Sequence, residues 1–355
     1  MEQRIKRIQE ILNKDDAALI MSDTNRLYFT GFKSSAGVVL ITKREAFLLI
    51  DFRYIESARQ NVKHMNVLLA EKLYSQIAEI LKANEIKNFF LETGYITLES
   101  FKTLKSALGD FNISDDNVLS RTISNLRSIK DSREIEFIKK AQALTDQTFE
   151  YALSIIKNGI TEKELALNME FFMRQNGSEG TAFDFIAVSG KNSSLPHGVP
   201  TDKRIENGDF ITMDFGAVVG GYRSDMTRTV ALGFVNDRQR EVYETVLKAQ
   251  LTALQNIKSG TECCKIDKIA RDIITDAGYG KCFGHGLGHS VGLEIHENPA
   301  CNTRDKTLLK SGMIMTVEPG IYIENSFGVR IEDMVVVTDS GCINLTKSPK
   351  ELIVL

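Results

Sequence analysis

The sequence has no long hydrophobic run, no excess of one charge and few cysteines. No apolar segment approaches the roughly 18 residues of a membrane-spanning helix, and the longest apolar segments are short runs such as Gly37–Ile41. Basic side chains number 44 against 47 acidic ones, a net charge of -3 that argues against a large basic surface for nucleic acid, and no basic amphipathic stretch suggests a helix on a membrane surface. The five cysteines include no Cys-x-x-Cys pair, and the N-terminal segment lacks a signal-peptide core. We therefore expect a cytoplasmic protein with reduced thiols.

The length of 355 residues predicts two domains. Residues 1–122 alternate helix-like and strand-like segments, which is typical of an α/β domain around a small mixed sheet. The polar stretch Ser114–Arg121 marks the boundary, and residues 123–355 form the second domain. The expected helices of the first domain are Glu2–Asn13, Tyr54–Val62, Ser75–Ala83 and Leu98–Leu108, and its expected strands are Ala17–Met21, Gly37–Ile41, Ala46–Ile50, Val67–Ala70 and Asn88–Leu91.

The second domain contains a weak internal repeat with a period of about 100 residues. Asp131 and Glu134 form a capping-box pattern that opens a long helix to Ile156, and a second long helix spans Arg238–Ile257. Each is followed by a glycine, a threonine and another helix. Two later segments, 207–216 and 311–320, both place an acid six residues after one glycine and two before the next. The repeat predicts a domain with pseudo-two-fold symmetry.

Two pairs of acids flank predicted hairpins, one pair in each half of the repeat. Asp214 and Asp225 enclose a glycine-rich turn, and Glu318 and Glu332 enclose a loop around Asn325. Side chains that face each other across a hairpin lie close enough to share an ion. A lone acid of this kind is usually a surface charge, but the neighbours of Asp214 and Glu332 are apolar, and an unpaired carboxylate is costly there. Four converging carboxylates repel unless cations neutralise them, so the pattern predicts a metal centre.

Four of the five histidines lie in the second half of the chain, close to these acids and to glycines: His197, His285, His289 and His296. Two of them, His285 and His289, share the segment 283–292 with four glycines. So much glycine argues against the helix of a His-Glu-x-x-His zinc protease. Any one of these histidines alone is more simply explained as a structural residue, but their clustering with the acids favours a functional site.

These motifs resemble the metallopeptidases of the pita-bread fold, which include methionine aminopeptidase, Xaa-Pro aminopeptidase and prolidase. The resemblance covers essentially the whole chain and implies a homodimer whose subunits have a creatinase-like α/β domain followed by a pita-bread catalytic domain. Carried over motif by motif, the ligands of two divalent metal ions would be Asp214, Asp225, His289, Glu318 and Glu332. Other matches are to substrate-contacting or supporting histidines and to residues that mark the proline-specific branch: His197, His285, His296, Tyr322 and Arg330.

The resemblance implies hydrolysis of the Xaa-Pro bond at the N-terminus of short peptides with proline in the second position. The oxygen-rich ligand set suits Mn²⁺, with Co²⁺, Fe²⁺ and Zn²⁺ as alternatives. Glu318 would move a proton to the leaving nitrogen, and His296 would donate a hydrogen bond to the oxyanion. His197 would hold the substrate. The wall for the proline ring would be formed by His285, Tyr322 and Arg330.

Three other interpretations stay open at this stage. A dipeptidase (prolidase) would have to bind the C-terminal carboxylate of its substrate. The sequence does not show which basic residue, if any, would do so, and an aminopeptidase is slightly preferred. Methionine aminopeptidases keep the same ligands but usually lack an N-terminal domain of this size. A non-catalytic scaffold protein of the same fold would have lost ligands, and the five ligand positions here are intact.

Overall fold

The computed structural model describes all 355 residues, and the contacts within it divide the chain into two units, Met1–Arg127 and Ser128–Leu355. Each unit has hydrophobic clusters of its own. No helix combines the length and the apolar composition that crossing a bilayer requires.

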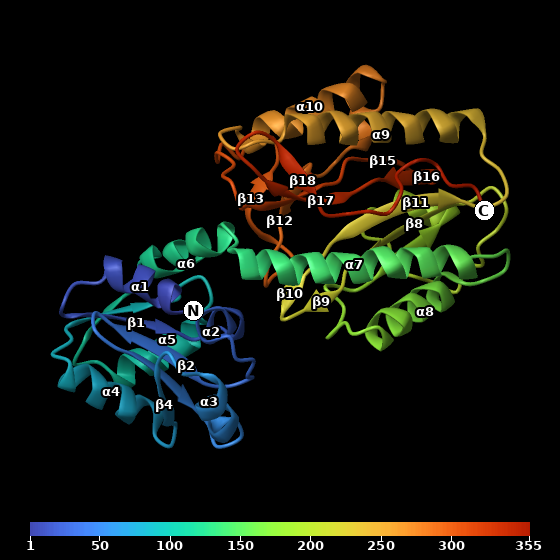
Figure 1. Cartoon of the computed structure of the whole chain (residues 1–355). Helices are drawn as coiled ribbons and strands as arrows, with labels where there is room; N and C mark the ends of the chain where they lie inside the picture. Colours follow the sequence, from blue (N-terminus) through green and yellow to red (C-terminus); the bar gives the residue numbers. More distant parts are fainter. The chain divides into compact units, whose positions relative to one another are not determined.

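The first unit is built on a six-stranded mixed sheet (Figure 1). The strand order is β4-β3-β2-β1-β5-β6, in which β2 runs antiparallel to β1 and β3 and the other neighbours are parallel. The strands are β1 (Asp16–Ile20), β2 (Val38–Thr42), β3 (Ala46–Ile50), β4 (Asn66–Leu69), β5 (Asn88–Leu91) and β6 (Asn112–Ser114). The helices are α1 (Glu2–Ile11), α2 (Asp23–Thr30), α3 (Ile55–Asn61), α4 (Leu73–Ala83), α5 (Leu98–Ala107) and α6 (Val118–Ser128).

The elements that the sequence predicts for this unit all form, with ends within two residues of those expected. Strands β1, β2 and β3 are buried at every position, which explains why they appear as short continuous apolar runs. Helices α2 and α6 and strand β6 were not predicted. Helix α2 buries Arg26, whose guanidinium donates to the Gly37 and Ser34 carbonyls, so no apolar stripe marks it. Helix α6 begins inside the polar stretch Ser114–Arg121.

The second unit encloses its strands between two pairs of helices. Helices α7 (Ser132–Ile155) and α8 (Glu162–Gln175) lie on one side, and α9 (Asp237–Asn256) and α10 (Cys263–Asp276) lie on the other (Figure 1). The first half holds β7 (Ile186–Ser189), β8 (Phe210–Phe215), β9 (Val218–Val219), β10 (Tyr222–Arg223) and β11 (Met226–Ala231), with the 3₁₀ turn Gly190–Ser194. The second half holds β12 (Gly288–Ser290), β13 (Glu297–Cys301), β14 (Ile314–Val317), β15 (Gly320–Ile323), β16 (Phe327–Arg330), β17 (Asp333–Val337) and β18 (Cys342–Asn344), with the 3₁₀ turn Gly280–Cys282.

The internal repeat is present in the structure. Capping boxes open both long helices, with Asp131 as N-cap of α7 and Asn236 as N-cap of α9. Gly159 and Gly260, which follow these helices, have φ angles of 93° and 86°, and a Cβ atom at either would meet open space. Glycine is therefore favoured at these two positions by the left-handed backbone conformation and not by any lack of space for a side chain.

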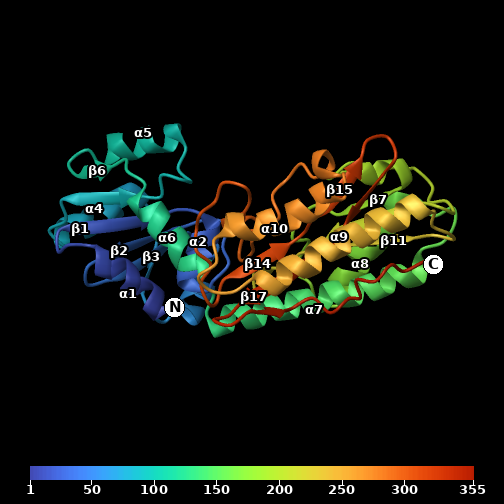
Figure 2. The same cartoon turned by 90° about the horizontal axis from the view of Figure 1, so that it is seen from above.

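The two halves of the second unit meet along strands that contain or directly adjoin the predicted acids. In the first half Asp214 pairs with Thr227 across β8 and β11, and in the second half Val317 pairs with Asp333 across β14 and β17. The halves are joined directly, because the Glu332 amide donates to the Thr227 carbonyl at 3.1 Å. The C-terminal segment runs beside α7 (Figure 2), where Asp146 accepts a hydrogen bond from the Ser348 hydroxyl at 2.6 Å.

Candidate metal centre

Three carboxylates from the two halves converge at the strand ends. Asp214 lies near the end of β8, Asp225 immediately precedes β11, and Glu332 immediately precedes β17. All three are buried, and their oxygens lie within 4.8 Å of one another. One oxygen of Asp214, Oδ1, is buried without any hydrogen-bond partner. An unpartnered carboxylate oxygen among other carboxylates is a suitable ligand for a cation.

His289 and Glu318 extend this cluster. The Nε2 atom of His289 lies 3.3 Å from Oε1 of Glu318 and 3.6 Å from Oδ2 of Asp225. The Nδ1 atom faces the Ser290 carbonyl at 3.2 Å and must donate to it, so Nε2 turns a lone pair towards the acids. Burial lowers the pKa of His289 to about 4, and the ring is therefore neutral near pH 7. A neutral imidazole that faces two carboxylates fits the donor set of a divalent ion.

The electrostatics of the cluster also fit cations. Burial, reinforced by the neighbouring carboxylates, raises the pKa of Asp225 and of Glu332, and burial raises the pKa of Glu318 to about 8. Without a counter-charge these groups resist ionisation together, because like charges in a buried site repel. Bound divalent cations relieve that repulsion. The five residues thus offer four carboxylates and one imidazole, which suit divalent ions.

Two threonine hydroxyls orient the acids, and the sequence analysis missed both. Thr227 Oγ1 donates to Oε2 of Glu332 at 2.7 Å, and Thr316 Oγ1 donates to Oε1 of Glu318 at 3.1 Å. Each threonine lies two residues from an acid along its strand, Thr227 after Asp225 and Thr316 before Glu318. Residues two apart along a strand lie on the same face, and this spacing could have indicated that each threonine lies on the same face as an acid.

A chain of hydrogen bonds runs from the acids to His285. Arg330 donates from Nη2 to Oδ2 of Asp214 at 2.6 Å and from Nη1 to the Tyr322 hydroxyl at 2.7 Å. That hydroxyl lies 3.0 Å from Nε2 of His285, whose Nδ1 donates to the Gly286 carbonyl at 2.8 Å. The Tyr322 hydroxyl therefore donates to His285, and both ring nitrogens are occupied. Burial, with help from Arg330, lowers the pKa of His285 to about 4, so it offers a neutral ring.

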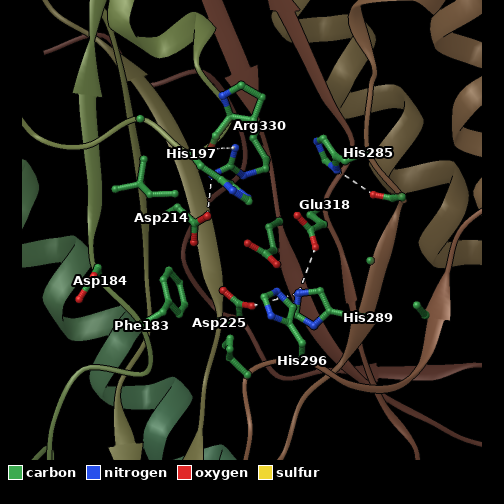
Figure 3. Close-up of a pocket in the computed structure, with 18 of the residues that line it drawn as sticks. Phe183, Asp184, His197, Asp214, Asp225, His285, His289, His296, Glu318 and Arg330 are labelled. Carbon is green, nitrogen blue, oxygen red and sulfur yellow. Dashed lines mark hydrogen bonds and ion pairs between the residues drawn. The ribbon is translucent and has the colours of Figure 1, made fainter.

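The acids, the histidines and Arg330 line one cavity of about 760 Å³, a size suited to a small ligand (Figure 3). Tyr322 does not line it, although its hydroxyl is hydrogen-bonded to both Arg330 and His285. His197 and His296 line it, are exposed and form no hydrogen bond within the chain. The predicted site residues that do line the cavity are His197, Asp214, Asp225, His285, His289, His296, Glu318, Arg330 and Glu332. Its further walls, which the sequence did not suggest, include Phe183, Asp184, Phe185, Ile186, Ile295 and Asn302.

The loop that carries His197 is held at both ends by one buried acid. Glu162, in the first turn of α8, is fully buried and accepts hydrogen bonds from the Ser189 amide at 2.7 Å and from the Thr201 hydroxyl at 2.6 Å. It also accepts from the Asn192 side chain at 3.2 Å. Sequence analysis gave Glu162 no role, because an acid in the first turn of a helix is common for dipole reasons alone.

We expect Glu162→Gln to lower kcat/KM by about 10- to 100-fold. The N–H groups of the glutamine side chain would face the hydrogen-bond donors that Glu162 now accepts from, and the loop that carries His197 would shift. The measurement is a double-mutant cycle with His197→Ala, in which the Glu162→Gln loss should largely vanish once His197 is absent. Glu164→Gln, on the same helix turn but exposed, is the matched control. An equal loss in both backgrounds would show that Glu162 does not act through His197.

Together the fold and the donor cluster define the class: a metal-dependent hydrolase with a carboxylate-rich centre between two symmetry-related halves. The chain belongs to Metallopeptidase family M24, which matches residues 136–339, and the Creatinase/Prolidase N-terminal domain matches residues 4–129. The protein is thus a metallopeptidase, and its family implies divalent metal ions. The predicted fold, a creatinase-like domain followed by a pita-bread domain, is confirmed.

Individual relatives match along the whole chain. An Xaa-Pro dipeptidase of Pyrococcus furiosus is 41% identical over 356 residues, covering 99% of this chain and 100% of that protein. The solved structure of an Xaa-Pro dipeptidase from Bacillus anthracis superposes with a TM-score of 0.96 at 42% identity, covering 99% of both chains. An X-Pro aminopeptidase from Thermotoga maritima superposes with a TM-score of 0.91 at 38% identity, covering 99% of this chain and 100% of that one.

Proposed function

We propose that the protein is an Xaa-Pro dipeptidase that splits dipeptides before proline. The names of the Pyrococcus and Bacillus relatives support this proposal. They favour the dipeptidase, which the sequence analysis kept as its alternative, over the aminopeptidase that it slightly preferred.

The observation that supports the proline preference is the wall that Arg330 and His285 form beside the acids, with the Tyr322 hydroxyl bonded to both from outside the cavity lining. The amide nitrogen of proline has no hydrogen, so its site needs no acceptor there. Both nitrogens of His285 are already engaged, and the guanidinium of Arg330 only donates. This wall therefore presents a ring surface without a free acceptor, against which a pyrrolidine ring can pack.

We assign two divalent ions to Asp214, Asp225, His289, Glu318 and Glu332, with Mn²⁺ as the preferred metal because the set is rich in hard oxygen donors. Such ions supply Lewis acidity and make water a nucleophile near neutral pH. The unpartnered Oδ1 of Asp214 and the lone pair of His289 Nε2 support the assignment. Thr227 and Thr316 keep Glu332 and Glu318 in place for this task.

The remaining residues handle the peptide. Glu318 is half-buried beside the other acids, with its Oε1 atom 3.3 Å from Nε2 of His289, and would take the proton of the attacking water and pass it to the proline nitrogen as the bond breaks. His296, whose ring centroid lies 4.4 Å from that of His289, is free to donate a hydrogen bond to the oxygen that becomes negative. His197, on the loop tied by Glu162, orients the substrate from the other edge of the cavity (Figure 3).

We expect His296→Ala to lower kcat by roughly 10²- to 10³-fold, the loss typical of one oxyanion donor. Metal content, measured by atomic emission after gel filtration, should not change, because His296 is not among the proposed ligands. His64→Ala is the control, since His64 lies in the first unit and bonds the Phe29 carbonyl. A variant that lost metal in step with activity would instead identify His296 as a ligand.

The test of the function is a chromatographic assay of the Mn²⁺-loaded protein on Ala-Pro, Ala-Pro-Ala and Met-Ala-Ser. Cleavage of Ala-Pro with little cleavage of Ala-Pro-Ala is expected. Cleavage of the tripeptide at its Ala-Pro bond would restore the aminopeptidase interpretation. Cleavage of Met-Ala-Ser alone would overturn the proline preference and leave the metal assignment standing.

The proposal includes a homodimer, which the resemblance to the family implies. Leu167 and Phe171 on α8 are 66% and 69% exposed, an apolar surface that a second subunit would cover. Light scattering coupled to gel filtration measures the mass directly, and a monomer of 39.7 kDa would contradict this part of the proposal.

A further inference from the structure

A second, smaller cavity adjoins the main one in the second unit. Its volume is about 340 Å³, and its walls come mainly from α8 and from the segment around Phe185. Two residues, Asp184 and Phe185, belong to the linings of both cavities. Asp184 thus lies where the linings of the two cavities meet.

The charges around the second cavity leave one acid uncompensated. Lys163 pairs with Asp202 at 2.9 Å, and Glu170 pairs with Arg174 at 2.8 Å. Asp184 is the remaining charged residue of this lining. It is exposed and has neither an ion pair nor a hydrogen bond within the chain. Its carboxylate is free to receive a cation from a ligand.

Asp184 also differs from the other acids of the main cavity. Those acids all belong to the buried cluster assigned to the metal ions, and the arginine among them, Arg330, is bonded to Asp214. Figure 3 shows Phe183 and Asp184 on one side of the cluster and His285 on the opposite side. With proline against the His285 wall, the residue before it extends across the cluster towards Phe183 and Asp184.

We propose that Asp184 selects a basic residue, lysine or arginine, at the position before proline. This inference rests on the proposed function and names the substrates that the site prefers. The aliphatic stem of such a residue packs along the apolar side chains of Phe183 and Ile186, and its cationic end reaches the carboxylate of Asp184. The substrate's own α-amino group is only two bonds from the reacting carbonyl carbon and stays beside the buried acids.

The experiment compares Lys-Pro with norleucyl-proline, which has a neutral side chain of similar length, and with Glu-Pro. For the Mn²⁺-loaded wild type, kcat/KM for Lys-Pro should exceed that for norleucyl-proline by about fivefold, the size expected of one partly exposed charge pair. Asp184→Asn should bring this ratio to about one, and Asp184→Lys should make Glu-Pro a better substrate than Lys-Pro. Glu206→Gln, which also removes one exposed negative charge but lines neither cavity, should leave the ratio as in the wild type.

The outcomes separate this inference from the function on which it rests. If no Xaa-Pro dipeptide is cleaved, the proposed function fails. If all three are cleaved and the Lys-Pro to norleucyl-proline ratio is the same in wild type and Asp184→Asn, the function stands and the role of Asp184 is refuted. A uniform loss for all three dipeptides in Asp184→Asn also refutes it, because it would show that Asp184 binds the α-amino group common to them.

Discussion

Glu332→Ala is expected to abolish peptide hydrolysis, with a loss well beyond the ~10- to 100-fold that removing a supporting residue of a metal site costs. One carboxylate oxygen of Glu332 lies within 4.8 Å of an oxygen of Asp214 and an oxygen of Asp225, so in the proposed two-ion centre Glu332 would be shared between the ions. Its loss removes a shared ligand and leaves the Thr227 hydroxyl without its acceptor. The measurement is kcat/KM on Ala-Pro together with the number of metal ions retained after gel filtration.

The stability of the same variant distinguishes a lost ligand from a misfolded protein. In the chelator-treated state Glu332→Ala should melt no lower than the wild type, because it removes one of several buried, mutually repelling carboxylates. Glu324→Ala, an exposed acid in the hairpin between Glu318 and Glu332, is the matched control and should keep full activity. If Glu332→Ala kept a tenth of the wild-type turnover, the dinuclear assignment would be wrong.

Removal of the ions with a chelator is expected to lower the melting temperature by about 5–10 °C near pH 8 and by much less near pH 5. Burial raises the pKa of Glu318 to about 8 and also raises the pKa values of Asp225 and Glu332. At these three carboxyl groups the folded chain without ions therefore binds protons more tightly than the unfolded chain does. The contribution of these three groups to the stability of the ion-free protein is greatest below about pH 4 and is lost as the pH rises through about 8. Bound cations cancel this loss, so the difference between the two states grows with pH.

Differential scanning calorimetry with and without EDTA, across this pH range, measures the effect. Glu332→Ala serves as the control, because a protein with an incomplete donor set gains little from added Mn²⁺. A shift of equal size at all pH values would mean that the ions bind away from the buried carboxylates.

Local patterns were enough to predict most of the fold. Buried strands such as Ala46–Ile50 are continuous apolar runs, and the capping box of Asp131 and Glu134 marks the start of α7. Helix α2 was not predicted because its buried face carries Arg26, whose hydrogen-bond partners lie in the following loop. A pattern of apolar residues cannot indicate such partners, because they depend on how the loop after the helix folds back against it.

For the site, the sequence predicted the residues that supply charge but not those that position them. The acids stand out because carboxylates such as Asp214 interrupt apolar strands, and the repeat pairs them. The supporting groups are unremarkable in sequence: Thr227 and Thr316 suit any strand, and Glu162 suits any helix start. Asp184 went unnoticed for the same reason, since only the tertiary structure places it between two cavities.

The proposed donor atoms come from both halves of the repeat, Asp214 and Asp225 from one and His289, Glu318 and Glu332 from the other. The affinity for the ions should therefore depend on how closely the two halves pack against each other. A substitution at their seam, where the Glu332 amide meets the Thr227 carbonyl, will weaken metal retention before it unfolds either half. Titration with Mn²⁺ thus reports damage at this seam that the spectroscopic signature of secondary structure would miss.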